Sequence, residues 1–282
     1  MGRRVFVCYL RPLTALTLSV LAPVALAFDS VAGNPILDRF SFDIGTYLYG
    51  SGTTVTLNGQ SGERGFPIDL EHDLGFENVN RFRIDGYWRI TKHQRLRLMY
   101  FQVDRQTTKT LQRTLQYGNY TYPVSASVSA SNDVSVASLA WEYDFFVRDH
   151  VSLGANIGVH NLDFKLALSG SATGPNGTRT PEASQTGSAD GPLPMLGLAG
   201  IFRASSRFYF TADLAALKVT VNPYSGTLTD FGATAVWRPF NHFGVGAGYD
   251  FFRLTASVDA DRFNGRLDWR YSGPRVFFNA SF

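Results

Sequence analysis

The sequence has a single cysteine, few charged residues and, beyond its first segment, no apolar run long enough for a membrane-spanning helix. One cysteine excludes an intrachain disulfide framework. A charged fraction of 17% beside 44% hydrophobic residues excludes a disordered chain, because such a chain lacks the apolar area that would offset its ordering entropy. Without apolar runs of ~20 residues, a bundle of helices that crosses a bilayer is excluded as well.

Glycine and aromatic residues are abundant instead. The 282 residues include 27 Gly, 23 Phe and 13 Tyr. Glycine weakens helices and aromatic side chains favour pleated surfaces, so this composition favours β-structure. The length allows one or two ordinary domains with a sizeable core.

Residues 1–27 have the three parts of a secretory signal: a basic start, an apolar stretch over residues 13–26 and the small-residue end Ala25-Leu26-Ala27. We predict cleavage after Ala27, because an arginine and two prolines leave too few apolar residues for a spanning helix. The paired arginines at the start also resemble a twin-arginine signal, which stays an alternative. Residues 28–282 then form the mature chain.

The positive charge of the sequence belongs to this leader. Arg3, Arg4 and Arg11 account for the formal net charge of +3, and the leader contains no Asp or Glu. Their removal leaves as many basic residues as the 23 acidic ones. We therefore expect no nucleic-acid partner, because such partners require a basic surface. Cys8 leaves with the leader too.

From Phe40 onward apolar and polar residues alternate with a period of two, which indicates strands. In residues 80–90, for example, Phe82 and Ile84 share one face while Arg81 and Arg83 share the other. The pattern predicts an all-β fold, a closed antiparallel transmembrane barrel of about ten strands, with eight as the alternative. The expected strands lie near residues 40–56, 80–90, 95–107, 134–147, 150–168, 193–204, 207–220, 227–238, 241–258 and 265–282.

Short and long connections alternate along the chain. Long connections are expected at residues 57–79, 107–133 and 169–192, and tight turns lie between them. Outer-membrane barrels place short turns in the periplasm and long loops outside the cell. Residues 169–191 are rich in Gly, Ser and Thr, which predicts a flexible linker without packed structure.

Together, these features resemble the small bacterial outer-membrane β-barrel proteins, OmpA-like in the broad sense. Residues 73–76 (DLGF) and 81–89 (RFRIDGYWR) are similar to poorly characterised members of that group. The resemblance implies a Gram-negative outer membrane, a surround of outer-membrane lipid and assembly by the barrel-assembly machinery. In such proteins that machinery reads a C-terminal aromatic residue with alternate apolar residues before it. Phe278 and Phe282 are the candidate assembly signal, although Ala280 stands where a second aromatic residue is usual.

Strand parity places many charged residues on the face opposite the aromatic ones. In a barrel that spans lipid the apolar face points outward and the charged face lines the lumen. Opposite charges at equal height are then expected to pair, because unpaired buried charges are costly. The predicted lumen set is Asp43, Arg81, Arg83, Asp85, Arg89, Arg97, Glu142, Asp144, Asp213, Asp250 and Arg275.

Counting residues from the short turns predicts particular partners within this set. Asp43 is expected to approach Arg89, Arg97 to approach Glu142 or Asp144, and Asp250 to approach Arg275. About ten strands enclose little more space than side chains fill. We therefore predict a largely filled lumen held by ion pairs, and a structural or interaction role at the cell envelope with possible extracellular contacts through the long loops.

Two other functions stay open. A porin-like narrow channel would use the same charges to select small polar solutes. A hydrolase of the protease or lipid A deacylase type would need a cluster at a rim or on the lipid face, and His160 is the one candidate, without a matching triad. Residues 69–73 carry oxygen ligands suited to calcium, but their spacing is not that of an EF-hand, so a solvated loop is expected. We predict no catalytic residue, cofactor or metal site.

Overall fold

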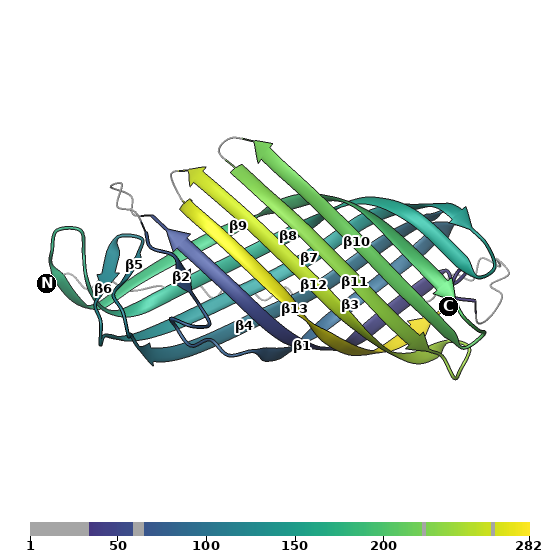
Figure 1. The fold of residues 1–282 in the computed structure, drawn as a ribbon, viewed down its shortest axis with the longest axis horizontal. Coiled ribbons are helices and arrows are strands. Elements are labelled where there is room, and N and C mark those ends of the chain that lie inside the picture. The colour runs from purple at the N-terminus through teal and green to yellow at the C-terminus, as the bar shows by residue number, and fades with distance from the viewer. Residues whose placement is uncertain (1–33, 59–64, 222–223, 261–262) are drawn as a thin grey trace, which may run out of the picture.

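The computed structural model describes residues 34–58, 65–221, 224–260 and 263–282 (Figure 1). The predicted leader, residues 1–27, lies outside the described residues. Within those ranges the chain is all-β, and ten long strands form the barrel wall. They are β1 (Phe40–Leu57), β3 (Val79–Thr91), β4 (Gln94–Thr110), β7 (Ser127–Val147), β8 (Val151–Thr173), β9 (Arg179–Arg203), β10 (Phe208–Val221), β11 (Tyr224–Trp237), β12 (Phe243–Ala260) and β13 (Phe263–Ser281).

Three short strands lie in the long connections: β2 (Ile68–Asp69), β5 (Leu115–Tyr117) and β6 (Tyr120–Tyr122). Nowhere in the described part of the chain is there a helix that could cross a membrane.

The wall closes because β1 pairs with both β3 and β13, and every pairing in it is antiparallel. Following hydrogen-bonded neighbours around the wall from Phe40 leads back to β1 at Gly52. This offset means that the strands are strongly tilted, as barrel closure requires. The tilt is visible in Figure 1.

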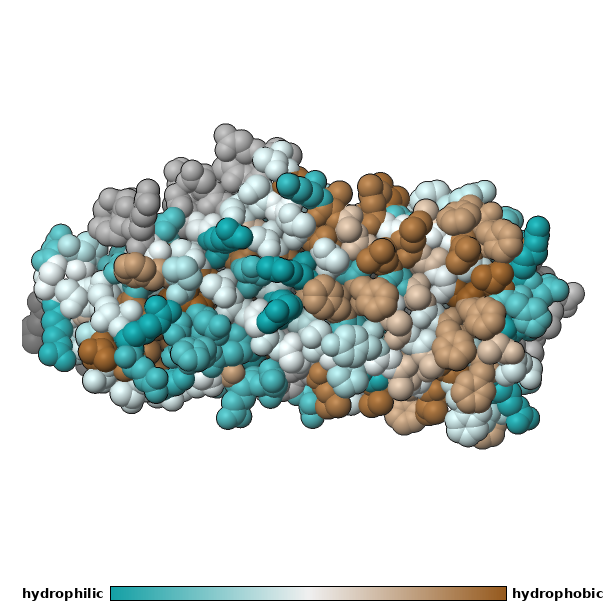
Figure 2. Space-filling view, in the orientation of Figure 1, coloured by the Kyte–Doolittle hydropathy of each residue, from teal (hydrophilic) through white to brown (hydrophobic). Residues whose placement is uncertain are grey.

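Around the short-turn end the outward face is apolar. Phe82, Trp88 and Phe278 are 57%, 41% and 74% exposed, although a water-soluble protein would bury most such side chains. Figure 2 shows apolar side chains gathered toward the end of the molecule that carries the C-terminus (Figure 1). An apolar outer band of this kind matches the lipid-facing surface of membrane barrels. Other members are Phe42, Ile44, Ile84, Leu98, Leu139, Trp141, Ile157, Leu198, Phe210, Leu214, Trp237, Val245 and Val276.

Beyond the band the polarity of the wall is reversed. On β4, Asp104 and Gln106 now face outward, while Phe101 and Val103 are buried inside. The same strands therefore enclose charged residues at one end and a large apolar core at the other. The outward face of this second half is polar, and we call it the projecting half.

The long connections help to fill the projecting half. Ile68, Leu70 and Leu74 of the first one are buried in its core. In the second, the Tyr117 hydroxyl donates to the carbonyl oxygen of Leu166 at 3.0 Å.

The prediction of a flexible linker at residues 169–191 is wrong. Most of these residues extend β8 and β9, which stay paired up to Thr173 and Arg179, and Ala183 is buried. Gly and Ser keep the side chains small here, but backbone pairing and the core behind the strands still order the segment. Composition alone did not reveal those long-range contacts.

The wall divides between β9 and β10. Pairing between these strands ends at Leu196 and Ala216, whereas β9 continues beside β8. Pro194 and Pro192 come just before Leu196 in the chain, on the side where the pairing has stopped. Neither proline has an N–H to donate. The two prolines therefore account for the end of the β9–β10 ladder.

Candidate functional site

The charged interior of the half that carries the apolar outer band is the candidate site. Four of its residues form a closed set of ion pairs in which each arginine bridges two carboxylates. Arg83 lies 2.8 Å from Asp85 and 3.7 Å from Asp250. Arg275 lies 2.7 Å from Asp85 and 3.1 Å from Asp250. Arg83 and Asp85 come from β3, Asp250 from β12 and Arg275 from β13. The Arg83–Asp250 and Arg275–Asp85 pairs therefore tie strands that are not neighbours in the wall.

A second set lies nearer the short turns. Arg95 contacts both Glu142 and Asp144, and Arg89 Nη1 donates to Asp144 Oδ2 at 2.9 Å. Both carboxylates are fully buried. Gly154 makes room for them, because a Cβ there would lie 2.6 Å from Asp144 Oδ1 and 2.8 Å from Glu142 Oε1.

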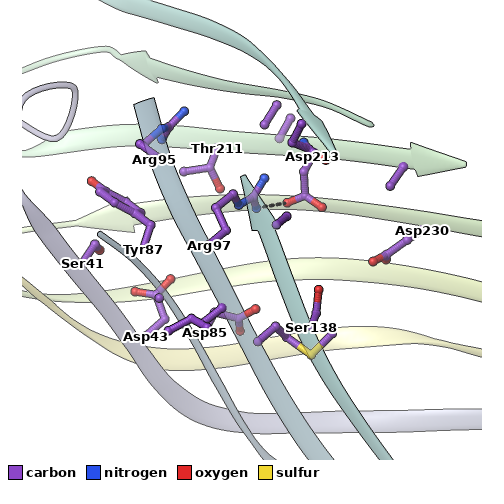
Figure 3. A pocket seen from close by; sticks show the side chains of 18 of the residues that line it. Ser41, Asp43, Asp85, Tyr87, Arg95, Arg97, Ser138, Thr211, Asp213 and Asp230 are labelled. Carbon is purple, nitrogen blue, oxygen red and sulfur yellow. Dashed lines mark hydrogen bonds and ion pairs between the residues drawn. The ribbon is translucent and has the colours of Figure 1, made fainter. Parts of the chain in front are cut away.

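Arg97 connects this second set to the opposite wall. Its guanidinium lies 3.4 Å from Glu142 and 3.3 Å from Asp213 on β10. Figure 3 shows Arg97 and Asp213 facing each other across the cavity. The pair therefore bridges β4 and β10, and both residues line the same cavity.

Two predicted lumen residues behave differently from the expectation. Asp43 does not pair with Arg89; its Oδ1 accepts a hydrogen bond from Asn279 at 2.6 Å. Arg81 donates to the backbone carbonyls of Asn80 and Asp104 and does not line the cavity. The shear of the barrel explains the Asp43 error, because counting from the turns does not give equal heights on neighbouring strands.

Parity would have added residues that were not predicted. Arg95 lies two positions before Arg97, on the same face of β4, and Asp230 lines the cavity from β11. Both follow the alternation of their strands, so the signal was present in the sequence.

A cavity of about 120 Å³ lies among these charges. His160 lines it and is 2% exposed, and neither ring nitrogen has a hydrogen-bond partner in the described structure. Asp230 Oδ2 is 3.6 Å from His160 Nε2. The cavity is polar and large enough for several water molecules, which would satisfy such groups.

An aromatic layer separates this cavity from the projecting half. Phe252 stacks on Tyr271 with ring centroids 4.8 Å apart, and Trp269 and Phe101 each lie 5.3 Å from one of these rings. All four side chains are buried. The layer closes the lumen on the side of the long loops.

The segment before β1 closes the opposite end. Ile36 is 1% exposed and packs in an apolar cluster that includes Val147, Tyr209 and Phe277. Asp38, two residues later, forms a buried ion pair with Arg238. We call residues 34–38 the plug segment.

In the acidic stretch at residues 69–73, carboxylates are bound by arginine side chains of the same chain. Glu71 is bound by Arg105 at 2.8 Å, and Asp73 is paired with Arg113. Burial acts to raise the pKa of Asp73, but hydrogen bonds from Arg113 and from the Asp69 backbone amide outweigh it and leave that pKa below its usual value. Among the described residues, no group of three or more His, Cys, Asp and Glu could hold a metal ion.

No family model and no curated protein matches the sequence. Solved structures do match. The outer-membrane protease OmpT from Escherichia coli has a TM-score of 0.58 at 10% identity, covering 87% of this chain and 97% of that one.

Lower similarity, with TM-scores of 0.38 and 0.32 and 10% identity, links the chain to the toluene transporter TodX of Pseudomonas putida and to Ail, the attachment invasion locus protein of Yersinia pestis. The first match covers 88% of this chain and 92% of that one, and the second 85% and 99%. At these identities the likeness concerns the fold alone. The chain is thus a closed ten-stranded antiparallel barrel with the fold of bacterial outer-membrane β-barrels.

Proposed function

We propose that the protein is an integral barrel of the bacterial outer membrane with a sealed lumen and a non-catalytic structural or interaction role at the cell surface. It would be one of the small bacterial outer-membrane β-barrel proteins that are OmpA-like in the broad sense, in a poorly characterised subgroup. The cleavable leader, the contact with outer-membrane lipid and the assembly signal at Phe278 and Phe282 belong to this proposal.

The observation that carries it is the double closure of the lumen. The plug segment blocks one end, and the aromatic layer around Phe252 blocks the other. Between them most of the charged side chains are bound to each other. A lumen whose charges are paired and covered at both ends offers no route to a solute.

The projecting half indicates where interaction would occur. Its outward face is polar along β7, β8 and β9. The molecule extends beyond the apolar band at the end away from the C-terminus (Figure 2). In the outer-membrane orientation this half lies outside the cell.

Conductance in planar lipid bilayers tests the proposal. The wild-type protein should give no discrete current steps. A variant that loses both seals, Ile36→Ala with Phe252→Ala, should give steps and so shows that insertion is detected. If the wild-type protein gives current steps and Arg83→Gln changes their size, the protein is a narrow channel and the proposal is overturned.

The hydrolase alternative has weaker support. His160 lies inside the lumen, and its ring centroid is 6.1 Å from that of Phe252 in the aromatic layer. A substrate at either rim of the barrel therefore does not contact it. OmpT is a protease, but the likeness to it is one of fold. Peptide or lipid A turnover by the wild type that disappears in His160→Ala would contradict a non-catalytic role.

A further inference from the structure

The division of the wall leaves a long strand edge open in the projecting half. The part of β9 that precedes Leu196 in the chain is paired with β8 on one side. Among the described residues, no backbone partner occupies its other side. An unpaired edge is a row of free N–H and C=O groups, to which another extended chain can add.

Strand parity identifies which backbone groups are free. The prolines at 192 and 194 sit within the β8–β9 ladder, so their nitrogens face away from β8. With a period of two, the N–H and C=O groups of Asp190, Ser188, Thr186 and Ser184 face the same open side. The open edge therefore runs from residue 184 to residue 190.

This edge is held in place from behind. Ala183 is 2% exposed in the apolar core. Gly187 lies against Tyr117, and a Cβ at that position would be 2.4 Å from the Tyr117 hydroxyl oxygen. The strand is thus already in the geometry that pairing requires, so a partner would not need to order it.

The charges beside the edge indicate the partner. Glu182 and Asp190 lie at its two ends with exposed side chains, and neither has an ion-pair partner in the described structure. Asp163 lies directly opposite Asp190 on β8. Lys165 Nζ lies 3.0 Å from Asp163 Oδ2 and already neutralises that carboxylate, and its charge also acts on Asp190. The acidic groups that a cationic side chain on an added strand would meet are therefore those of Glu182 and Asp190, at the two ends of the edge.

We propose that the open edge of β9 binds an extended basic peptide segment of a partner protein, which adds to the wall as a further strand. This inference rests on the proposed interaction role and gives it a partner class. Backbone hydrogen bonds to residues 184–190 supply the affinity, and Glu182 and Asp190 select lysine or arginine side chains.

The test uses the full mature chain in lipid nanodiscs and a short synthetic peptide of alternating threonine and valine with lysine near each end. Exchange of the amides that face the open side, those of Ser184, Thr186, Ser188 and Asp190, should slow when the peptide is added. A copy of the peptide with N-methylated amides should not bind, because it cannot donate. A copy with glutamate in place of lysine should bind at least about tenfold more weakly.

Proline substitution separates backbone pairing from side-chain contact. Thr186→Pro with Ser188→Pro removes two N–H groups that face the open side and leaves the β8–β9 ladder intact, as the natural prolines do. Binding should weaken about tenfold or more. The matched Thr186→Ala and Ser188→Ala control keeps both N–H groups and should bind within about twofold of the wild type.

Unchanged exchange at saturating peptide, or equal binding of the N-methylated copy, would overturn the inference, and so would unimpaired binding by the proline variant. If that variant does not assemble, comparing the N-methylated and unmodified peptides on the wild-type protein still tests the inference. Conductance is measured on the same preparation. A conducting protein that binds the peptide would refute the sealed lumen alone, whereas a silent one that fails to bind would refute the peptide site alone.

Discussion

The rings of Phe252 and Tyr271 stack with planes 11° apart, directly between the charged lumen and the apolar core of the projecting half. His160 meets the other side of this boundary, with its ring edge-on to Phe252. The interior of the barrel therefore changes from charged groups to aromatic packing across a single layer of side chains.

Truncation at this boundary should be costly. Phe252→Ala should lower the free energy of unfolding by about 3–5 kcal/mol, because it removes a fully buried ring and leaves a cavity. Urea unfolding followed by tryptophan fluorescence measures this loss. Phe231→Ala, at a half-exposed outward position on β11, is the control and should cost much less. Equal losses would contradict a packed boundary.

Arg95 should be the most sensitive member of the charged interior. Arg95→Met leaves Glu142 and Asp144 close together with one bridging cation fewer, so we expect a loss of about 3–5 kcal/mol. Adding Glu142→Leu removes one of the two carboxylates and should recover part of that loss. If the double variant is less stable than the single one, the bridging role of Arg95 is incorrect. Heat-modifiable gel mobility and urea unfolding measure both variants.

Acid should loosen the first long connection. The pKa of Asp73 is lower in the folded protein than in the unfolded chain, where it is about 3.9. The contribution of Asp73 to stability is therefore complete above about pH 4 and is lost as the pH falls through the lower, folded value. Protease cleavage within residues 65–78 should increase over that acid range. Arg113→Gln should cause the same increase at neutral pH, and no difference from wild type would remove the pair from the explanation.

Replacing the two prolines should extend the β9–β10 ladder. Pro192→Thr with Pro194→Thr restores two N–H donors that face β10, and the strand continues beyond Ala216 as far as Val221. Amide exchange of Lys218 and Thr220 should slow in this variant. Pro181→Thr, near the other end of β9, is the control and should leave these amides unchanged. Unchanged exchange in the double variant would mean that something other than proline ends the pairing.

Much of the fold could be predicted from local pattern. β3 was expected at residues 80–90 and spans Val79–Thr91, because a lipid-facing and a lumen-facing side chain alternate at every step. β9 was expected only from residue 193, because its first part carries small residues on both faces. Its order comes from β8 and from Tyr117, which are distant in sequence.

The charged lumen was predictable by face and not by partner. Alternation placed Asp250 and Arg275 inside, and they lie 3.1 Å apart. Asp43 and Arg89 were matched by height along the strands, and tilt moves such matches by several residues. The aromatic layer was not predicted. Phe252 and Tyr271 have the parity of lumen-facing residues, and their apolar character fits the interior only because the polarity of the wall reverses above the band.

In the proposed outer-membrane orientation, the reversal of polarity places polar side chains on the half of the wall that must be carried across the membrane. The serine, threonine and aspartate side chains outside the projecting half would then cross the hydrocarbon layer, where each unsatisfied polar group is costly. Joining β13 to β1 closes the wall and brings Arg275 to Asp85. Closure of the barrel at this seam and formation of that ion pair are therefore coupled.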